Sequence, residues 1–204
     1  MLRMRHGRSR WRNGFLVSEA VEIRMDEAKR IRKLRNQKDL SLRKVADACN
    51  ISASLLSQIE TGRVDPSLNT LRKIAQALDV PLFQLVLEEQ GGTTGLVKKG
   101  QRRMVVFPLS GLQYEIIHSD LQKKMGIHIG TLNPGGMTSE EPLAHPGEEC
   151  LIVLEGRMKV EMRGEAIELG PQDSLYFDSS IPHRLCNARK TDCIFYLIIT
   201  PPKF

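Results

Sequence analysis

The spacing of apolar residues changes once along this chain, and that change limits the folds open to it. From residue 26 to about residue 87, apolar side chains recur every three or four positions, as they do on one face of a helix. Beyond residue 97 they gather in short runs rich in Val, Ile, Tyr and Phe, which is typical of strands. Glycines and threonines fill much of the stretch between, residues 89–97, and predict a linker. We therefore predict two domains, the first all-α and the second all-β.

The first domain, residues 25–88, divides into five short helical segments. Ser41 and Ser52 each stand just before a helical run, where a serine hydroxyl can accept a backbone N–H of the first turn. The sequence "TGRVDPS" breaks the chain after the second of these runs. Pro81 fits the first turn of a last short helix, because that position needs no N–H donor. The pattern predicts a small all-α unit.

The second domain, residues 98–204, contains short runs of strand-forming residues. Turn sequences such as "NPGG", "HPGEE" and "LGPQD" separate them. Many short strands at this spacing predict an antiparallel sandwich or barrel. The runs are "RRMVVFPL", "QYEIIH", "KMGIHIGTL", "CLIVLEG", "RMKVEMR", "EAIELG", "DSLYFDS", "HRLCNA" and "CIFYLIIT".

The net positive charge of the chain lies entirely in its first half. Residues 1–90 contain 17 Lys and Arg against 11 Asp and Glu, whereas residues 91–204 contain 13 of each. Residues 1–24 form a basic arm in which five arginines precede the first carboxylate, Glu19. A cationic surface favours polyanions, because contact with phosphates releases condensed counterions. The charge distribution is therefore consistent with a nucleic-acid partner for the first domain.

Cysteine usage and hydropathy indicate the compartment. The chain has four cysteines and no CxxC pair, so we interpret them as reduced thiols rather than a disulfide framework. No apolar run approaches the roughly 18 residues that a membrane span needs. The basic N-terminus lacks the sustained apolar stretch of a signal peptide. We expect a cytoplasmic protein with no membrane partner.

One segment of the first domain carries a specific pattern, "LSLRKVADACNISASLLSQIETGRVDPSLNTLRKIAQALDVPL". A small residue, Ala46, precedes an apolar residue at a turn, Ile51, and "IETG" then closes the next helix. Over residues 26–87 this pattern resembles the helix-turn-helix of the phage-repressor-like (XRE) regulators. The resemblance implies that the helix "ASLLSQIE" enters the major groove of DNA.

The resemblance also implies which side chains touch DNA. Gln58 can bond adenine through two hydrogen bonds, and the methyl group of Ala53 can meet a thymine methyl. Where many relatives have glutamine at the start of the preceding helix, this chain has Leu42, which removes one expected contact. The implied base contacts are Ala53, Ser54 and Gln58, and the implied phosphate contacts are Arg43, Ser52, Ser57, Arg63 and Asn69.

Two segments of the second domain carry another pattern, "NPGGMTSEEPLAHPGEECLIVLEG" and "LGPQDSLYFDSSIPHRLCN". They resemble the two signature motifs of the cupin fold, a double-stranded β-helix barrel. His145, Glu149 and Gly156 occupy motif positions in the first segment, and His183 does so in the second. Leu143 stands where the family's first histidine belongs, so one of the four usual metal ligands is absent.

Three ligands leave two alternatives open. His145, Glu149 and His183 match the two-histidine, one-carboxylate set of mononuclear non-haem Fe(II) sites. If a divalent metal binds, Zn²⁺, Fe²⁺, Mn²⁺ and Ni²⁺ are all candidates. The other interpretation is a metal-free pocket in which the two histidines form hydrogen bonds.

Carboxylates and tyrosines near these motifs predict the ligand class. Negative charge and aromatic faces suit a cationic or amine ligand. The predicted ligand-binding residues are Tyr114, Glu140, Glu141, His145, Glu148, Glu149, Tyr176 and His183. Two further histidines, His118 and His128, lie on predicted strands, where either could supply a fourth metal ligand or simply belong to the sheet.

Together the two resemblances imply a DNA-binding regulator of the HTH–cupin class rather than an enzyme. The expected partners are an operator, a small-molecule effector of the amine, polyamine or amino acid class, and a second copy held through the cupin domain. The alternative is a non-haem Fe(II) cupin oxygenase or epoxidase that uses His145, Glu149 and His183. The basic first half and its polar recognition helix favour the regulator, because a scaffold has no need of either.

Overall fold

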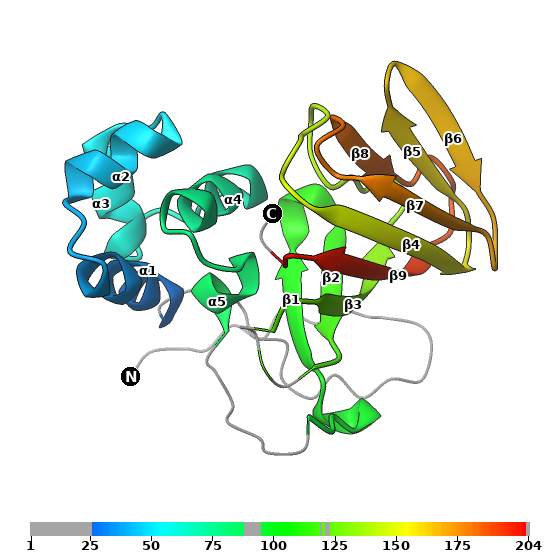
Figure 1. Cartoon of the computed structure of the whole chain (residues 1–204), viewed down its shortest axis with the longest axis horizontal. Helices are drawn as coiled ribbons and strands as arrows, with labels where there is room; N and C mark the ends of the chain where they lie inside the picture. The colour runs from blue at the N-terminus through cyan, green and yellow to red at the C-terminus, as the bar shows by residue number, and fades with distance from the viewer. Residues whose placement is uncertain (1–25, 88–94, 119, 121–122, 203–204) are drawn as a thin grey trace, which may run out of the picture.

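Five helices form the first domain in the computed structural model, which describes residues 26–87, 95–118, 120 and 123–202. They confirm the predicted all-α unit (Figure 1). None of the described helices has the length and apolar character needed to cross a membrane. The predicted arm and most of the predicted linker lie outside the described residues. The helices are α1 (Asp26–Gln37), α2 (Leu42–Cys49), α3 (Ala53–Glu60), α4 (Leu68–Ala77) and α5 (Leu82–Val86).

Serine caps begin α2 and α3, as the sequence predicts. Ser41 Oγ accepts the backbone N–H of Lys44 at 3.2 Å, and Ser52 Oγ accepts that of Leu55 at 3.0 Å. Each hydroxyl thus satisfies a donor that has no partner within the first helical turn. The prediction that Pro81 lies in the first turn of α5 is off by one residue. The helix begins at Leu82, so Pro81 lies just before it.

Close packing of α2 against α3 builds the helix-turn-helix. Ala46 is fully buried, and its small side chain lets the two helices approach each other. Val45, Leu56 and Ile59 are buried beside it and supply the core. Asn50 adopts a left-handed backbone conformation, with φ of 53°, and so ends α2 and turns the chain toward α3.

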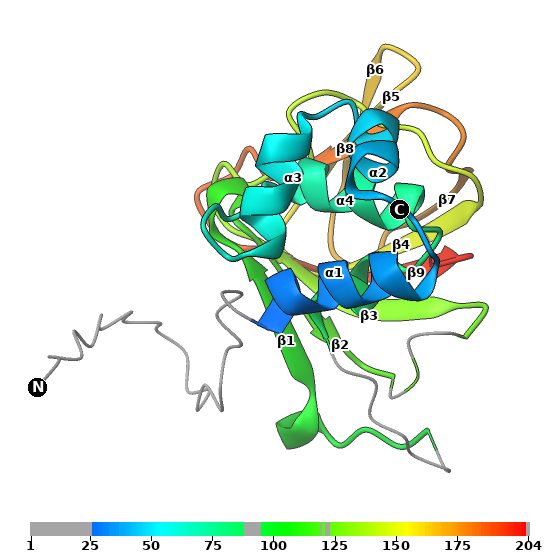
Figure 2. The ribbon, with the colours of Figure 1, turned by 90° about the vertical axis from the view of Figure 1, so that its left-hand side faces the viewer.

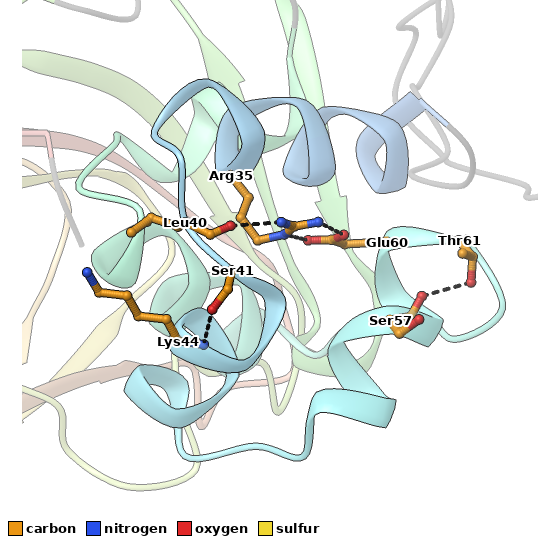
Figure 3. A network of polar contacts seen from close by, with 7 residues as sticks. All are labelled: Arg35, Leu40, Ser41, Lys44, Ser57, Glu60 and Thr61. Atoms are coloured by element: carbon orange, nitrogen blue, oxygen red, sulfur yellow. Dashed lines mark hydrogen bonds and ion pairs between the residues drawn. The ribbon is translucent and has the colours of Figure 1, made fainter.

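A partly buried ion pair ties α3 to α1 (Figure 3). Arg35 Nε and its Nη2 donate to the two carboxylate oxygens of Glu60 at 2.7 and 2.9 Å. A third donor of the same guanidinium bonds the carbonyl of Leu40 at 2.8 Å. A bidentate pair of this kind fixes the relative orientation of the two side chains better than a single hydrogen bond does. It therefore fixes the angle at which α3 is presented.

Among its described residues the second domain has nine strands, which confirm the predicted all-β barrel. Six of them pair in the order β1-β2-β3-β9-β4-β7, and three in the order β6-β5-β8. The paired strands are antiparallel, and the four cysteines carry free thiols as predicted. The strands are β1 (Arg103–Phe107), β2 (Leu112–Ile116), β3 (Gly126–Leu132), β4 (Glu148–Glu155), β5 (Met158–Met162), β6 (Glu165–Leu169), β7 (Ser174–Asp178), β8 (His183–Cys186) and β9 (Cys193–Thr200).

The two domains pack against each other through aromatic rings. Phe83 of α5 meets Tyr114 of β2 edge to face, with ring centroids 5.6 Å apart, and lies 4.6 Å from the ring of His128 on β3. All three side chains are buried, so the apolar core continues from the helices into the barrel. Figure 1 shows α4 and α5 on the barrel side of the helical domain, with α2 and α3 on the far side. Figure 2 shows the helices in front of the strands from that side.

His128 generates a prediction about acid stability. Its ring is completely buried among Phe83, Tyr114 and His118. Burial, together with the nearby ring of His118, lowers the pKa of His128 to about 3. As the pH falls, His128 of the unfolded chain, with an ordinary pKa near 6.5, takes up a proton at a higher pH than His128 of the folded chain does. The free energy of unfolding therefore falls as the pH drops from about 6.5 toward 3. We expect His128→Leu to remove part of this fall, worth about 2 kcal/mol between pH 6.5 and pH 5.

Urea unfolding at pH 7 and pH 5 measures this difference. The wild-type protein should lose more stability between the two pH values than His128→Leu does. Equal losses in the two proteins would show that His128 is protonated while folded and that its site is not as dry as its burial indicates.

Candidate functional site

A cavity of about 300 Å³ lies where α4 meets the mouth of the barrel. This volume is at the lower end of the range of roughly 300–1,000 Å³ that is usual for small-molecule sites. The helical domain contributes Asn69, Arg72, Lys73, Ala75, Gln76, Asp79 and Val80 to its lining. The barrel contributes Tyr114, Thr138, Ser139, Leu143, Ala144, His145, Pro146, Glu149, His183, Leu185, Leu197 and Pro201.

Strand alternation turns two of the motif residues inward. Along β4 the buried positions are Glu149, Leu151 and Val153, so the carboxylate lies on the face that lines the barrel. On β8 the buried positions begin with His183. The segment before β4 is held against β8 by two backbone hydrogen bonds between Leu143 and His183, both 2.9 Å long. These contacts bring the residues of the two sequence motifs together.

Both histidines of the cluster meet the same carboxylate oxygen. His145 Nε2 lies 2.8 Å from Glu149 Oε1, and His183 Nε2 lies 3.5 Å from it. Burial alone would raise the pKa of Glu149, which is only 5% exposed, but hydrogen bonds from the two histidines outweigh burial and hold that pKa at about 2. For His183, burial lowers the pKa, but Glu149 and the Ile181 carbonyl raise it by more. Glu149 is therefore ionised at neutral pH.

The hydrogen bond on the far side of His183 determines what the cluster can hold. Its Nδ1 lies 2.8 Å from the carbonyl oxygen of Ile181, which can only accept, so Nδ1 carries the proton. In the neutral ring, Nε2 then directs its lone pair toward Glu149. That arrangement suits either a protonated ring or a cation between the donor atoms. Metal-bound histidines commonly donate their other N–H in this way.

Three donor atoms are thus placed for a divalent ion. One ligand atom from each of His145, Glu149 and His183 lies within 4.8 Å of the others. Two histidines and one carboxylate suit Zn²⁺, Fe²⁺, Mn²⁺ or Ni²⁺. His118 and His128 lie outside this group: His128 packs on Phe83 at the domain contact, and the ring of His118, which follows β2, lies 5.2 Å from that of His128. Neither histidine supplies the missing fourth ligand.

Of the other predicted ligand-binding residues, only Tyr114 lines the cavity. Burial raises the pKa of its hydroxyl, so Tyr114 is neutral at physiological pH. Glu140, Glu141 and Glu148 are exposed and lie outside the lining. Tyr176 is 64% exposed, because alternation along β7 turns its neighbour Phe177 inward instead. The prediction that these four residues line the pocket is not supported by their placement.

The predicted DNA-binding face lies mostly on α3, away from the barrel (Figure 1). Ser54 and Ser57 are exposed on this helix, and Ala53 and Gln58 are half-buried. Beside it lie three exposed residues: Ser52, which caps α3; Arg43 of α2, 4.0 Å from Asp47; and Arg63, which follows the helix. These seven predicted contacts are exposed or half-buried, as contact with DNA requires.

Asn69 is placed differently from the other predicted DNA contacts. It lies at the start of α4 and lines the cavity between the domains. Its neighbours on that wall, Arg72 and Lys73, were not predicted as site residues. Their sequence context, "LNTLRKIAQA", is an ordinary amphipathic helix. Only the docking of α4 on the barrel gives these residues a ligand-facing role.

Comparison with known proteins agrees with both halves of this structure. The family model described as Helix-turn-helix matches residues 31–85, and the one described as Cupin domain matches residues 128–199. The HTH-type transcriptional regulator DdrOP3 from Deinococcus deserti is 34% identical over 92 residues, which are 44% of this chain and 71% of that protein. This chain belongs to the HTH–cupin transcriptional regulators.

Two further matches extend over nearly the whole HTH–cupin chain. The HTH-type transcriptional regulator PuuR from Escherichia coli K12 is 27% identical over 177 residues, which are 86% of this chain and 95% of that protein. A crystal structure of an HTH_3 family transcriptional regulator from Vibrio cholerae is 25% identical, with a TM-score of 0.69, and covers 89% of this chain and 98% of that one. Both are similar to this protein across the two domains together.

The geometry of the cluster generates a prediction about metal binding. We expect one divalent ion per chain, bound through His145, Glu149 and His183. Removing a ligand with His183→Ala should weaken binding by more than the roughly 10–100-fold that loss of an outer-shell partner costs. Titration of chelator-treated protein with Zn²⁺, Mn²⁺, Ni²⁺ and, without oxygen, Fe²⁺ measures this. His118→Ala is the matched control and should bind as the wild-type protein does.

Proposed function

We propose that this protein is a sequence-specific, DNA-binding transcriptional regulator whose cupin domain senses a small metabolite. The observation that carries the proposal is the cavity between α4 and the barrel, because one wall of it belongs to the DNA-binding domain. A ligand there contacts both domains. It can shift their arrangement by as much as it prefers one arrangement over another.

Operator recognition is assigned to the exposed side of α3. Gln58, Ala53 and Ser54 contact bases, while Arg43 and Arg63 contact phosphates. Ser52, which caps α3, and Ser57, within the helix, join the phosphate contacts. The partly buried pair between Arg35 and Glu60 supports this role, because it holds α3 against α1 and leaves the opposite side of α3 exposed.

The effector belongs to the amine, polyamine or amino acid class. Glu149 supports this proposal, because it is an ionised carboxylate in a largely enclosed site. A divalent ion at His145, Glu149 and His183 would offer a second point of attachment for an amine or carboxylate group. Substrate turnover is not part of this function. As a regulator of transcription, the protein would act in the cytoplasm.

A second candidate function rests on the same cluster. Two histidines and one carboxylate are the ligand set of mononuclear Fe(II) oxygenases. PuuR and the Vibrio cholerae protein, which match both domains, are named as transcriptional regulators, which supports the first proposal. The enzyme would be favoured if the Fe²⁺-loaded protein consumes oxygen or peroxide and Glu149→Gln abolishes this consumption. Metabolites should then have no effect on DNA binding.

DNA binding is tested most directly at Gln58. We predict that Gln58→Ala costs about 1–3 kcal/mol of affinity for the operator and relaxes specificity at one base pair. Arg63→Ala should weaken binding to all sequences and reduce the salt dependence, because it removes a phosphate contact. Fluorescence anisotropy at several salt concentrations, on duplexes selected from a random pool by the wild-type protein, measures both effects.

The controls for this experiment make the same two substitutions, Gln→Ala and Arg→Ala, on the barrel. Gln113→Ala on β2 and Arg189→Ala after β8 should leave operator affinity unchanged. If the wild-type protein selects no sequence and shows no salt-dependent DNA binding, the regulator proposal is wrong.

A homodimer through the cupin domain completes the proposal. One recognition helix reads only a few base pairs, whereas a symmetric pair reads two half-sites about one DNA turn apart. We predict a dimer at micromolar concentration in sedimentation. Cross-linking of mixed isotopically light and heavy subunits should join barrel lysines such as Lys159 and Lys190 between copies. A monomer, or cross-links between copies at Lys29 and Lys33 of α1 alone, would contradict this arrangement.

A further inference from the structure

The two walls of the cavity carry opposite chemistry. The barrel wall presents the carboxylate of Glu149 between His145 and His183. The helical wall presents two cations on α4, Arg72 and Lys73, and one acidic residue after the helix, the exposed Asp79. Most of the remaining lining is apolar, so charges within it are poorly screened by water. A ligand that fills this space meets negative charge at one end and positive charge at the other.

Arg72 is the cation that the barrel encloses. Its Nη1 donates to the carbonyl of Thr138 at 2.7 Å. Burial lowers the pKa of Arg72, while Tyr114 and Glu149 act electrostatically to raise it. The guanidinium carries five N–H donors, and a fork of two of them matches a carboxylate better than any neutral acceptor. Arg72 is therefore suited to bind an anionic group of a ligand inside the cavity.

The same arginine connects the two domains. Thr138 is bonded to β8 through Leu185, whose backbone N–H donates to Thr138 Oγ1 at 3.0 Å. Leu185 follows the cluster residue His183 by two positions on that strand. On the other side, α4 buries Leu71 and Ile74 in the core of the helical domain. Arg72 is thus connected on one side to the strand that carries His183 and on the other to the core of the helical domain. A change in what Arg72 binds can therefore affect both.

We propose that the effector carries a carboxylate, that Arg72 of α4 binds this carboxylate, and that Arg72 thereby couples effector binding to the DNA-binding domain. This inference rests on the proposed function and narrows its ligand class to amino acids. A diamine or polyamine would place a second cation against Arg72 and Lys73. An amino acid places its carboxylate there and its ammonium group near Glu149.

A series of three probes with five carbons each tests the charge requirement on the wild-type protein. They are 5-aminopentanoate, 1,5-diaminopentane and pentanedioate. Calorimetric titration of the full chain is done after chelator treatment and again with Zn²⁺ present. We expect 5-aminopentanoate to bind at least tenfold more tightly than 1,5-diaminopentane in both states, since loss of one charge-assisted contact is worth about that much. With Zn²⁺ present, pentanedioate should also bind more tightly than the diamine.

Arg72→Met tests the residue, because it keeps an apolar stem and removes the donors. It should lose at least tenfold in affinity for 5-aminopentanoate. Its affinity for the selected operator should no longer change when that probe is added. Arg189→Met is the matched control, since Arg189 pairs with Glu168 on the exposed surface of the barrel. It should bind the probe and respond to it as the wild-type protein does.

Three results would overturn the inference. They are binding of 1,5-diaminopentane as tight as that of 5-aminopentanoate in both metal states, binding of neither carboxylate probe at millimolar concentration, and an Arg72→Met protein that binds and responds normally. The first and third leave the regulator proposal intact. That proposal fails separately, if the wild-type protein selects no operator. The probe series needs no variant, so it decides the charge requirement even if Arg72→Met does not fold.

Discussion

The contact of Phe83 with Tyr114 and His128 decides where the two halves of this molecule lie relative to each other. A buried aromatic ring contributes several kcal/mol of packing energy, so this contact resists separation of the domains. It joins α5, the last helix of the helical domain, to the sheet and continues one apolar core across the junction. With α5 docked in this way, α4 comes to rest on the mouth of the barrel.

Once α4 covers the barrel mouth, the cavity between the domains has a wall made by the DNA-binding domain. Arg72 reaches from that wall to the carbonyl of Thr138, beside the strand that carries His183. In the function that we propose, coupling between ligand and DNA needs no long chain of contacts, because a ligand in this cavity touches both domains. The recognition helix lies on the far side of the helical domain, where the ion pair of Arg35 with Glu60 holds it in place (Figure 3).

Local patterns in the sequence predict most of this architecture. The two serine caps, the small Ala46 and the alternating strands depend on residues close in the chain, and the structure confirms them. The convergence of His145, Glu149 and His183 can also be predicted from the sequence, because all three residues occupy positions in the two cupin motifs. The role of Arg72 could not be predicted, because it depends on how two domains dock. Tyr176 was assigned to the pocket because sequence alone does not say which face of a strand turns inward.

The central claim is that the effector site and the DNA-binding domain share a wall. Thermodynamic linkage makes this claim measurable, because a ligand that changes operator affinity must have its own affinity changed by the operator by the same factor. The measurement is the affinity of the full chain for 5-aminopentanoate, alone and with saturating operator duplex. We predict a change of roughly 5- to 150-fold, equal to the change that the ligand causes in operator affinity. Identical ligand affinities with and without the operator would contradict the account.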